Sequence, residues 1–260
     1  MRILLLGENG QLGQQLRRTL PLLGEVKACG RADVDFTDHN SITAAIEAFQ
    51  PDVIVNAAAY TAVDRAEKEQ KRAFQVNADA VALLAEQSAK HGIWLIHYST
   101  DYVFDGSKAE PYLESDTPNP INVYGESKLA GEEAIAASGC NHLLYRTPWV
   151  IGRDGPNFAK TILALACDRN TLNIVNDQFG VPTTPALIAK VTAEAIRAIA
   201  SGQPWPVGLY HLAPRGKTTW FGIAQSLFRL ARKQQLPLSL DAESPHACER
   251  QSLSRYCLCL

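Results

Sequence analysis

The sequence predicts an α/β fold: a Rossmann-type doubly wound parallel sheet with a smaller, interleaved C-terminal domain. Short apolar runs of strand length occur at residues 3–6, 25–29, 52–59, 93–96 and 143–146, and segments of helical periodicity separate them. The first run leads into a glycine-rich turn at the start of a helix. Strands that alternate with helices in this way are typical of a parallel sheet with helices on both faces.

Charge and hydropathy exclude several classes of partner. The formal net charge of the 260 residues is −2 and no basic cluster stands out, so no binding to nucleic acid is expected. No apolar run approaches the roughly 20 residues that span a bilayer, and the apolar start is too short for a signal peptide. We therefore expect a cytoplasmic protein without a membrane partner.

The cysteines predict neither disulfides nor a metal site. Cys29, Cys140 and Cys167 are scattered along the chain, which is typical of reduced packing residues. Cys248, Cys257 and Cys259 crowd the end of the chain but have no histidine at metal-ligand spacing. No metal is predicted.

The first turn has the pattern Gly-x-x-Gly-x-x-Gly. Gly7 allows the backbone to turn tightly, Gly10 allows a pyrophosphate to approach, and Gly13 allows the helix to pack on the strand. The N-terminus of the following helix offers free N–H groups and a favourable dipole to phosphates. The turn therefore predicts dinucleotide binding.

The residue after the second strand indicates which dinucleotide. NAD-specific sites usually carry an acid near this point, whereas this chain has Gly30 followed by Arg31. An arginine suits a 2′-phosphate because its planar fork makes bidentate contacts. Asp33 and Asp35 complicate the choice between NAD(H) and NADP(H). Asp35 and Phe36 are expected to line the adenine side of the dinucleotide site. NADP(H) is predicted, and NAD(H) stays open.

The third strand, within residues 52–59, ends in small side chains that would allow a cofactor to pass closely. Candidate contacts are Ala58, Ala59, Tyr60 and Thr61. A tight turn between strand and helix explains the same residues equally well. A helix from about residue 73 to His91 follows, and an earlier helix, capped by Asp38 or Ser41, ends before Pro51.

Polar residues follow the strand at 93–96. Ser99, Thr100 and Asp101 would lie at its carboxyl end, where open α/β sheets bind ligands. A helix is predicted from Val123 to Gly139. Tyr124 and Lys128 are four residues apart, so they share one face of that helix.

Tyr124 and Lys128 together have a chemical use. A tyrosine hydroxyl titrates near ~10, and an ammonium group one turn away favours the phenolate and lowers that pKa. A hydroxyl from Thr100 could hold a carbonyl oxygen beside the tyrosine. This combination predicts a general acid for ketone reduction, although Tyr-x-x-x-Lys also arises by chance on solvated helices.

The remaining chain continues the sheet and adds the second domain. Trp149 follows a strand end, so it belongs either to the core or to a ring-stacking site. Expected elements are a helix at 157–166, an ordered loop at 171–185, a helix at 187–199, a strand at 208–212, and a helix from about 219 to 230. We assign 1–147 to an NADP-binding Rossmann domain, to which 185–212 returns. Residues 148–184 and 213–260 form a substrate-binding part, incomplete at its C-terminus.

Together these segments resemble the extended short-chain dehydrogenase/reductase superfamily, and within it the dTDP-4-dehydrorhamnose reductases. The resemblance covers roughly residues 1–235 and rests on the motifs at 7–13, 52–64, 97–104, 123–131, 146–150 and 176–180. It implies hydride delivery from NADPH to the 4-keto carbon of dTDP-4-dehydro-L-rhamnose, with Tyr124 protonating the oxygen.

The resemblance also implies roles for individual residues. The catalytic set matches Thr100, Tyr124 and Lys128. The sugar-nucleotide contacts match Thr100, Asp101 and Trp149. The cofactor contacts match Gly10, Gln11, Leu12, Asp35, Phe36, Ala59, Tyr60, Thr61, Tyr98, Tyr124 and Lys128.

Two departures from the family pattern stand out. Family members run longer and carry an Arg-Pro-x-Asn-Ser-x-Leu segment that helps close the substrate site, whereas residues 244–260 resemble a frameshifted or truncated end. Gln14 and Gln15 stand where many relatives place an acid that takes part in a magnesium-bridged dimer. That metal is therefore not predicted. Monomer and homodimer both stay open.

Two other functions are compatible with the pattern. A related dehydratase or epimerase is one, but dehydratases usually carry Asp-Glu after the threonine, and this chain has Asp101-Tyr102. The other is a non-catalytic NADP-binding regulatory subunit of the methionine adenosyltransferase type. The complete set of Thr100, Tyr124 and Lys128 favours an enzyme.

Overall fold

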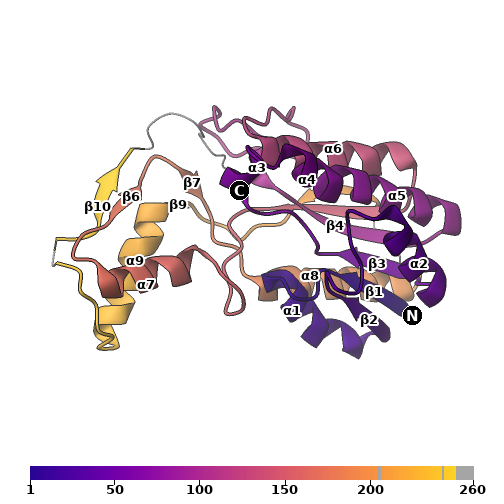
Figure 1. The fold of residues 1–260 in the computed structure, drawn as a ribbon, viewed down its shortest axis with the longest axis horizontal. Helices are drawn as coiled ribbons and strands as arrows, with labels where there is room; N and C mark the ends of the chain where they lie inside the picture. Colours follow the sequence, from indigo (N-terminus) through magenta and orange to yellow (C-terminus); the bar gives the residue numbers. More distant parts are fainter. Residues whose placement is uncertain (204–205, 242, 250–260) are drawn as a thin grey trace.

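A six-stranded parallel sheet forms the centre of the computed structural model, which describes residues 1–203, 206–241 and 243–249 (Figure 1). Its order is β2-β1-β3-β4-β5-β8. The strands are β1 (Arg2–Leu6), β2 (Glu25–Cys29), β3 (Val53–Asn56), β4 (Trp94–Thr100), β5 (His142–Thr147) and β8 (Gly208–His211). The order reverses between β1 and β3, and such a switch point opens a crevice at the carboxyl ends of the strands. The predicted Rossmann-type fold is confirmed.

Helices cover both faces of this sheet (Figure 1). One face packs on α1 (Gln11–Thr19) and α8 (Pro185–Ala200), and the other on α2 (His39–Phe49), α5 (Ala80–His91) and α6 (Val123–Ser138). Successive residues of β1 enter opposite clusters: Leu4 and Leu6 join one, Ile3 and Leu5 the other. Burial on both faces explains why residues 3–6 of the strand are all apolar.

Helix boundaries follow local capping signals. Asp38 caps α2 by accepting from Asn40 N, which settles the alternative with Ser41. Asn122 caps α6, and Gly139 ends it with a positive φ of 71°. The helix expected from about residue 73 begins earlier, as α4 (Gln70–Phe74), and passes through a π-helical turn, η2 (Gln75–Asp79), before α5. Short turns complete the body: η1 (Leu20–Leu22), α3 (Val63–Ala66) and η3 (Asp101–Val103).

A smaller lobe lies beside the sheet (Figure 1). Its helices α7 (Phe158–Asp168) and α9 (Trp220–Lys233) share an apolar core that includes Ile162, Ile174 and Phe228. Two short sheets complete it: β6 (Asn173–Val175) pairs with β10 (His246–Cys248), and β7 (Phe179–Gly180) pairs with β9 (Thr218–Thr219).

The predicted loop at 171–185 is therefore wrong, since it contains β6 and β7. Their partner strands come from residues 218–219 and 246–248, so no local pattern marks them. The segment expected to be a truncated end also contributes β10, while 250–260 lie outside the described residues. We keep as a proposal the division into 1–147 with 185–212, and 148–184 with 213–260.

None of the helices within the described ranges is long and apolar enough to cross a bilayer. The cysteines in those ranges, Cys29, Cys140, Cys167 and Cys248, are free thiols. The other two, Cys257 and Cys259, lie outside them.

Candidate active site

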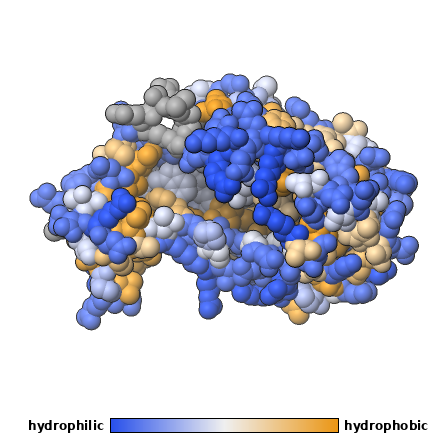
Figure 2. Space-filling model, viewed as in Figure 1, coloured by the Kyte–Doolittle hydropathy of each residue, from blue (hydrophilic) through white to orange (hydrophobic). Residues whose placement is uncertain are grey.

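Two adjoining cavities occupy the carboxyl ends of the strands. One of about 340 Å³ lies over β1 and β2, and one of about 540 Å³ extends from β3 and β4 to the small lobe. They share Gly10 and residues 57–59. Figure 2 shows the surface hollowed between the lobe and the body. The arrangement suits an elongated ligand that runs through both cavities.

The glycine turn has the geometry expected of it. Gly7 has a φ of 82°, and a Cβ there would lie 2.5 Å from Ala58 N. A Cβ at Gly13 would overlap the carbonyl oxygen of Gly7, so only glycine allows α1 to start this close to β1. Gly10 faces both cavities immediately before α1, which leaves the helix N-terminus open to a phosphate.

The smaller cavity has the character of a nucleoside site. The predicted residues that line it are Gly7, Gly10, Arg31, Asp35, Phe36, Ala58, Ala59 and Tyr60. Asp35 accepts hydrogen bonds from Thr37 N and Thr37 Oγ1, both 2.8 Å, and these bonds lower its pKa, as do Arg31 and Arg72 nearby.

Arg72 was missed by sequence reasoning. It belongs to α4 and lines the same cavity as Arg31, and neither arginine forms an ion pair with a described residue. Two guanidinium groups without a fixed anion make the outer part of this cavity suited to a phosphate. Nothing in the sequence around Arg72 marks it, because it lies some forty residues from Arg31 on an ordinary helix surface.

The larger cavity gathers the predicted catalytic residues. Thr100, Tyr124 and Lys128 line it together and are all buried. The other predicted residues that line it are Gly10, Gln11, Leu12, Ala58, Ala59, Thr61, Tyr98, Asp101 and Trp149. Of the predicted set, only Gly13 lines neither cavity, because it packs against the turn beneath them.

The pKa of Tyr124 differs from the prediction. This pKa is raised to about 12, chiefly by burial and to a smaller extent by the charge of Asp101, while the hydrogen bond with the Thr100 hydroxyl acts to lower it. Lys128 is not among the groups that shift this pKa; its amine donates to Tyr98 O at 2.7 Å and lies 3.1 Å from His97 Nε2. Burial also lowers the pKa of Lys128 to about 8. The expected lowering of the tyrosine pKa is thus wrong for this geometry, and the phenol keeps its proton at neutral pH.

Asp101 adds a second protonatable group beside Thr100. The Thr100 hydroxyl donates to Asp101 Oδ1 at 3.1 Å, while Oδ2 has no partner among the described residues. Burial raises the pKa of this carboxyl to about 7. Near neutral pH the group can therefore either donate or accept a hydrogen bond in the cavity.

Aromatic rings form the wall toward the small lobe. Trp149 stacks on Trp220 with the ring centroids 3.8 Å apart, and Phe158 lies 4.5 Å from Trp220. Trp149 is buried, stacks on Trp220 and lines the cavity, and its stacking on a ligand ring stays a prediction. Trp220 and Phe158 were expected only as parts of helices, and their place in the cavity depends on how the lobe packs.

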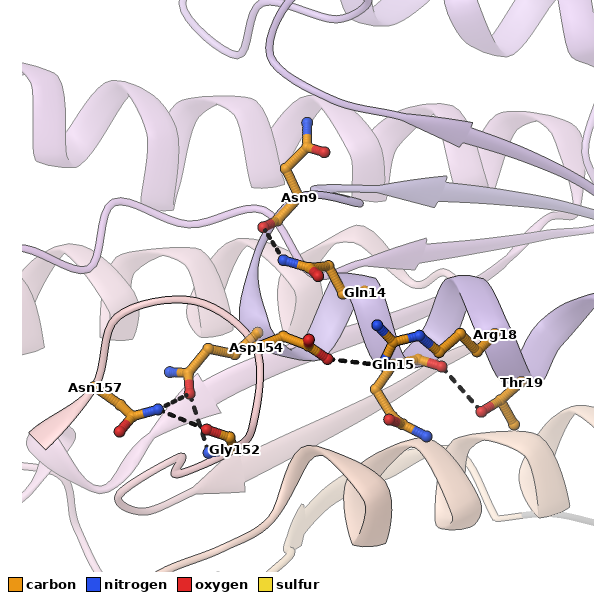
Figure 3. A network of polar contacts seen from close by, with 9 residues as sticks. Asn9, Gln14, Gln15, Arg18, Thr19, Gly152, Asp154 and Asn157 are labelled. Atoms are coloured by element: carbon orange, nitrogen blue, oxygen red, sulfur yellow. Dashed lines mark hydrogen bonds and ion pairs between the residues drawn. The ribbon is translucent and has the colours of Figure 1, made fainter. Parts of the chain in front are cut away.

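A polar network joins α1 to the segment that leads into α7 (Figure 3). The Gln11 side chain donates to Val150 O at 3.2 Å and accepts from Gly152 N at 3.1 Å and Asn157 Nδ2 at 3.0 Å. Arg18 pairs with Asp154 at 2.7 Å in the same region. These bonds fix the glycine turn relative to the small lobe.

Gln14 and Gln15 lie on the same helix. The side chain of Gln14 donates to Asn9 O, and the backbone oxygen of Gln15 accepts from the Thr19 hydroxyl (Figure 3). Across the described ranges, no cluster of histidine, cysteine and carboxylate side chains is placed to hold a metal ion.

Comparisons with known proteins agree with this geometry. The family model described as the RmlD substrate binding domain matches residues 1–256. The dTDP-4-dehydrorhamnose reductase of Escherichia coli K12 is 47% identical over 93% of this chain and 82% of that protein, and the one of Salmonella typhimurium LT2 is 45% identical over 92% and 81%. A crystal structure of dTDP-4-dehydrorhamnose reductase from Bacillus anthracis in complex with NADP has a TM-score of 0.89 at 31% identity, covering 100% of this chain and 90% of that one. The chain belongs to the RmlD substrate binding domain family.

Proposed function

We propose that the protein reduces dTDP-4-dehydro-L-rhamnose to dTDP-L-rhamnose with NADPH as the hydride donor. The observation that carries this proposal is the gathering of Thr100, Tyr124 and Lys128 in one buried cleft of a chain 45–47% identical to reductases with this name. The ketone, the hydride donor and the proton donor would then meet at the carboxyl end of β4.

The two cavities fit a dinucleotide. The turn at Gly7, Gly10 and Gly13 leaves no room for side chains, so the backbone and the start of α1 would hold the pyrophosphate. The adenosine would lie against Phe36, with Arg31 and Arg72 toward a 2′-phosphate. NADPH is therefore the proposed coenzyme, and NADH is its weaker alternative.

Tyr124 is proposed to act as the general acid. Bound NADPH supplies the hydride that reaches C4 of the sugar. Tyr124 gives its proton to the ketone oxygen, and a proton from solvent restores the phenol afterwards. A raised pKa suits this role because the group is protonated before each turnover. Thr100 would turn its hydroxyl from Asp101 Oδ1 to donate to the same oxygen and so orient it.

The rest of the cleft is proposed to select the sugar nucleotide. Asp101 would bind sugar hydroxyls, and Trp149 with Trp220 would offer flat apolar faces to a ring. Tyr102 follows Asp101 where elimination needs a second carboxylate, so simple reduction is favoured over dehydration. We also propose a cytoplasmic monomer or homodimer that needs no metal.

The test is turnover by the purified chain. The dTDP-4-keto sugar is generated in the assay, NADPH consumption is followed, and dTDP-rhamnose is identified by mass spectrometry and NMR. Tyr124→Phe is expected to lower kcat by about 10²–10⁴-fold, the usual range for a lost general acid, while the Kd for NADPH stays unchanged.

Tyr210→Phe is the matched control, because the Tyr210 hydroxyl donates to Pro206 O away from the cleft. It should keep the kcat of the unsubstituted chain. A near-normal kcat in Tyr124→Phe would show that another group supplies the proton. NADPH binding without any turnover by the unsubstituted chain would reject the reductase activity.

A further inference from the structure

One side chain joins the glycine turn to the segment that leads into the small lobe. Gln11 is the first residue of α1. Its amide nitrogen donates to Val150 O at 3.2 Å, and its amide oxygen accepts from Gly152 N at 3.1 Å and from Asn157 Nδ2 at 3.0 Å. Asn157 in turn donates to Gly152 O at 2.7 Å (Figure 3). The contact therefore joins parts of the chain that lie 139 to 146 residues apart in the sequence.

Backbone groups fix the direction of each of these hydrogen bonds. Val150 O can only accept and Gly152 N can only donate, so the Gln11 amide has one orientation. Asn157 Oδ1 accepts from Lys160 N at 3.1 Å as the cap of α7, which turns its NH₂ toward Gln11. Turning either side-chain amide would place two donors or two acceptors against each other. The junction therefore has a single arrangement of hydrogen bonds.

The segment also passes close to the Gln11 side chain. Gly155 has a φ of 69°, and a Cβ there would lie 3.1 Å from Gln11 Cγ. Arg18 adds an ion pair to Asp154 at 2.7 Å, but its side chain is 56% exposed, and exposed pairs contribute little to stability. The half-buried Gln11 amide is therefore the stronger polar contact between α1 and this segment.

The segment carries two of the aromatic residues that line the larger cavity. Trp149 and Phe158 each adjoin a residue that bonds to Gln11. Trp149 has a φ of 35°, a left-handed conformation that large side chains rarely adopt. A residue keeps such a conformation only where its surroundings hold it. The bond from Gln11 to Val150 O lies one residue away, so it helps to hold the Trp149 ring in the cleft.

The backbone of Gln11 belongs to the other side of the cleft. Gly10 and Gln11 line the larger cavity where α1 begins, and the first N–H groups of a helix have no partner within it. Without an anion this turn opens more readily, whereas a pyrophosphate would satisfy its N–H groups and hold it closed. Gln11 therefore connects the place proposed for the pyrophosphate with the segment that carries Trp149 and Phe158.

We propose that the Gln11 side chain is a positioning residue that couples NADPH binding to sugar-nucleotide binding. This rests on the proposed reductase function. NADPH holds the first turn of α1, the Gln11 amide passes the restraint to residues 149–158, and the aromatic wall of the cleft is held in place for the sugar nucleotide. Each ligand then tightens the binding of the other by the same factor. The effect needs both ligands, so the affinity of either one alone still reflects its own contacts.

The first test needs only the coenzyme. Hydrogen exchange is followed by NMR at the backbone amide of Lys160, which bonds to the Asn157 side chain. NADPH should slow this exchange about fivefold or more in the unsubstituted chain, and it should have no effect there in Gln11→Ala. Equal protection of Lys160 in the two proteins, or none in the unsubstituted chain, would overturn the proposal, whether or not the chain reduces the sugar.

The second test measures the coupling factor. dTDP-L-rhamnose is titrated into the chain by calorimetry with and without NADPH, because these two ligands are both already reduced and cannot react. NADPH should tighten the binding of dTDP-L-rhamnose about fivefold or more in the unsubstituted chain. In Gln11→Ala the factor should fall to about one, since the restraint no longer reaches the lobe.

Asn157→Asp separates the contact with Gln11 from the cap of α7. The carboxylate still accepts from Lys160 N, so the cap is kept. It also places an acceptor against Gln11 Oε1 and Gly152 O, where Asn157 donates. This variant should lose the coupling factor as Gln11→Ala does.

Gln14→Ala is the matched control, because the Gln14 side chain lies on the same helix and donates to Asn9 O within the glycine turn. It should keep the full coupling factor. A merely structural role of Gln11 would weaken dTDP-L-rhamnose equally with and without NADPH, and an unchanged factor in Gln11→Ala or in Asn157→Asp would overturn the proposal. Protection of Lys160 through Gln11, without any binding of dTDP-L-rhamnose, would reject only the proposed function.

Discussion

Arg31 and Arg72 are the residues expected to decide which coenzyme the protein prefers. They come from different elements but line the same cavity, where neither forms an ion pair with a described residue. Each single change to alanine should weaken NADPH binding about five- to twentyfold and leave NADH binding nearly unchanged. Fluorescence titration with both coenzymes measures this.

Lys71→Ala is the control for these variants, since Lys71 is the neighbouring cation on α4 but does not line the nucleoside cavity. It should bind both coenzymes as the unsubstituted chain does. If Arg72→Ala weakens NADPH and NADH equally, Arg72 does not contact the 2′-phosphate.

Asp101 should make stability depend on pH. Its pKa in the folded protein is about 7, against 3.8 ordinarily, so the folded state holds the proton more tightly than the unfolded chain. The resulting stabilisation is complete below about pH 4 and is lost as the pH rises to about 7. Asp101→Asn should therefore flatten the decline in the free energy of unfolding over this range.

Urea unfolding of both proteins from about pH 4 to about pH 8 measures the difference. Parallel curves would mean that the carboxyl is ionised in the folded protein throughout. The variant removes one titration only, so slopes caused by other groups cancel in the comparison.

Among the elements, α9 depends on a single cap. Thr219 Oγ1 accepts from Gly222 N at 3.0 Å, and the helix it starts carries Trp220 into the cleft. Thr219→Ala removes this cap and the hydrogen bond that the same hydroxyl donates to Asn176 Oδ1 at 2.7 Å, and it should lower the free energy of unfolding by about 1–2 kcal/mol. Thr219→Ser keeps the hydroxyl oxygen and should lower the free energy of unfolding much less. Equal losses in the two variants would assign the effect to the missing methyl group and not to the cap.

Elements that depend on neighbouring residues could be predicted, and elements that depend on distant ones could not. The helix at α6 follows from its own periodicity, with Asn122 and Gly139 at its ends. The strands β6 and β7 have two to three residues each and exist because residues 246–248 and 218–219 pair with them. The π-helical turn η2 also has no signal in the helical pattern around it.

The same distinction holds for the site. The glycine turn and the pair Tyr124 and Lys128 have local spacing, so the sequence indicates them. Arg72, Trp220 and the contact between His97 and Lys128 arise only when separate elements pack together. The direction of the pKa shift of Tyr124 was missed because spacing does not reveal how deeply a group is buried.

At the scale of the whole molecule, the proposed coenzyme contacts lie on the sheet side of the cleft and the proposed sugar contacts lie toward the lobe. Gly180 in β7 lies against the proposed sugar side of the cleft, since a Cβ there would lie 2.6 Å from the Trp149 ring. Gly180→Ala should displace that ring and raise KM for the sugar nucleotide several-fold. The Kd for NADPH, measured on the same variant, should not change because its proposed contacts lie on the body.

A rise in the NADPH Kd equal to the rise in KM would mean that the two sides of the cleft do not act separately. An unchanged KM would remove Trp149 from the proposed sugar site.

The pairing of β10 with β6 ties the small lobe to residues 246–248. A shortened chain that stops before these residues would leave the backbone N–H and C=O groups along one side of β6 without partners. An open strand edge of this kind recruits other chains, so such a product should self-associate instead of remaining a well-behaved but weaker enzyme. The few residues of β10 thereby cover one edge of β6.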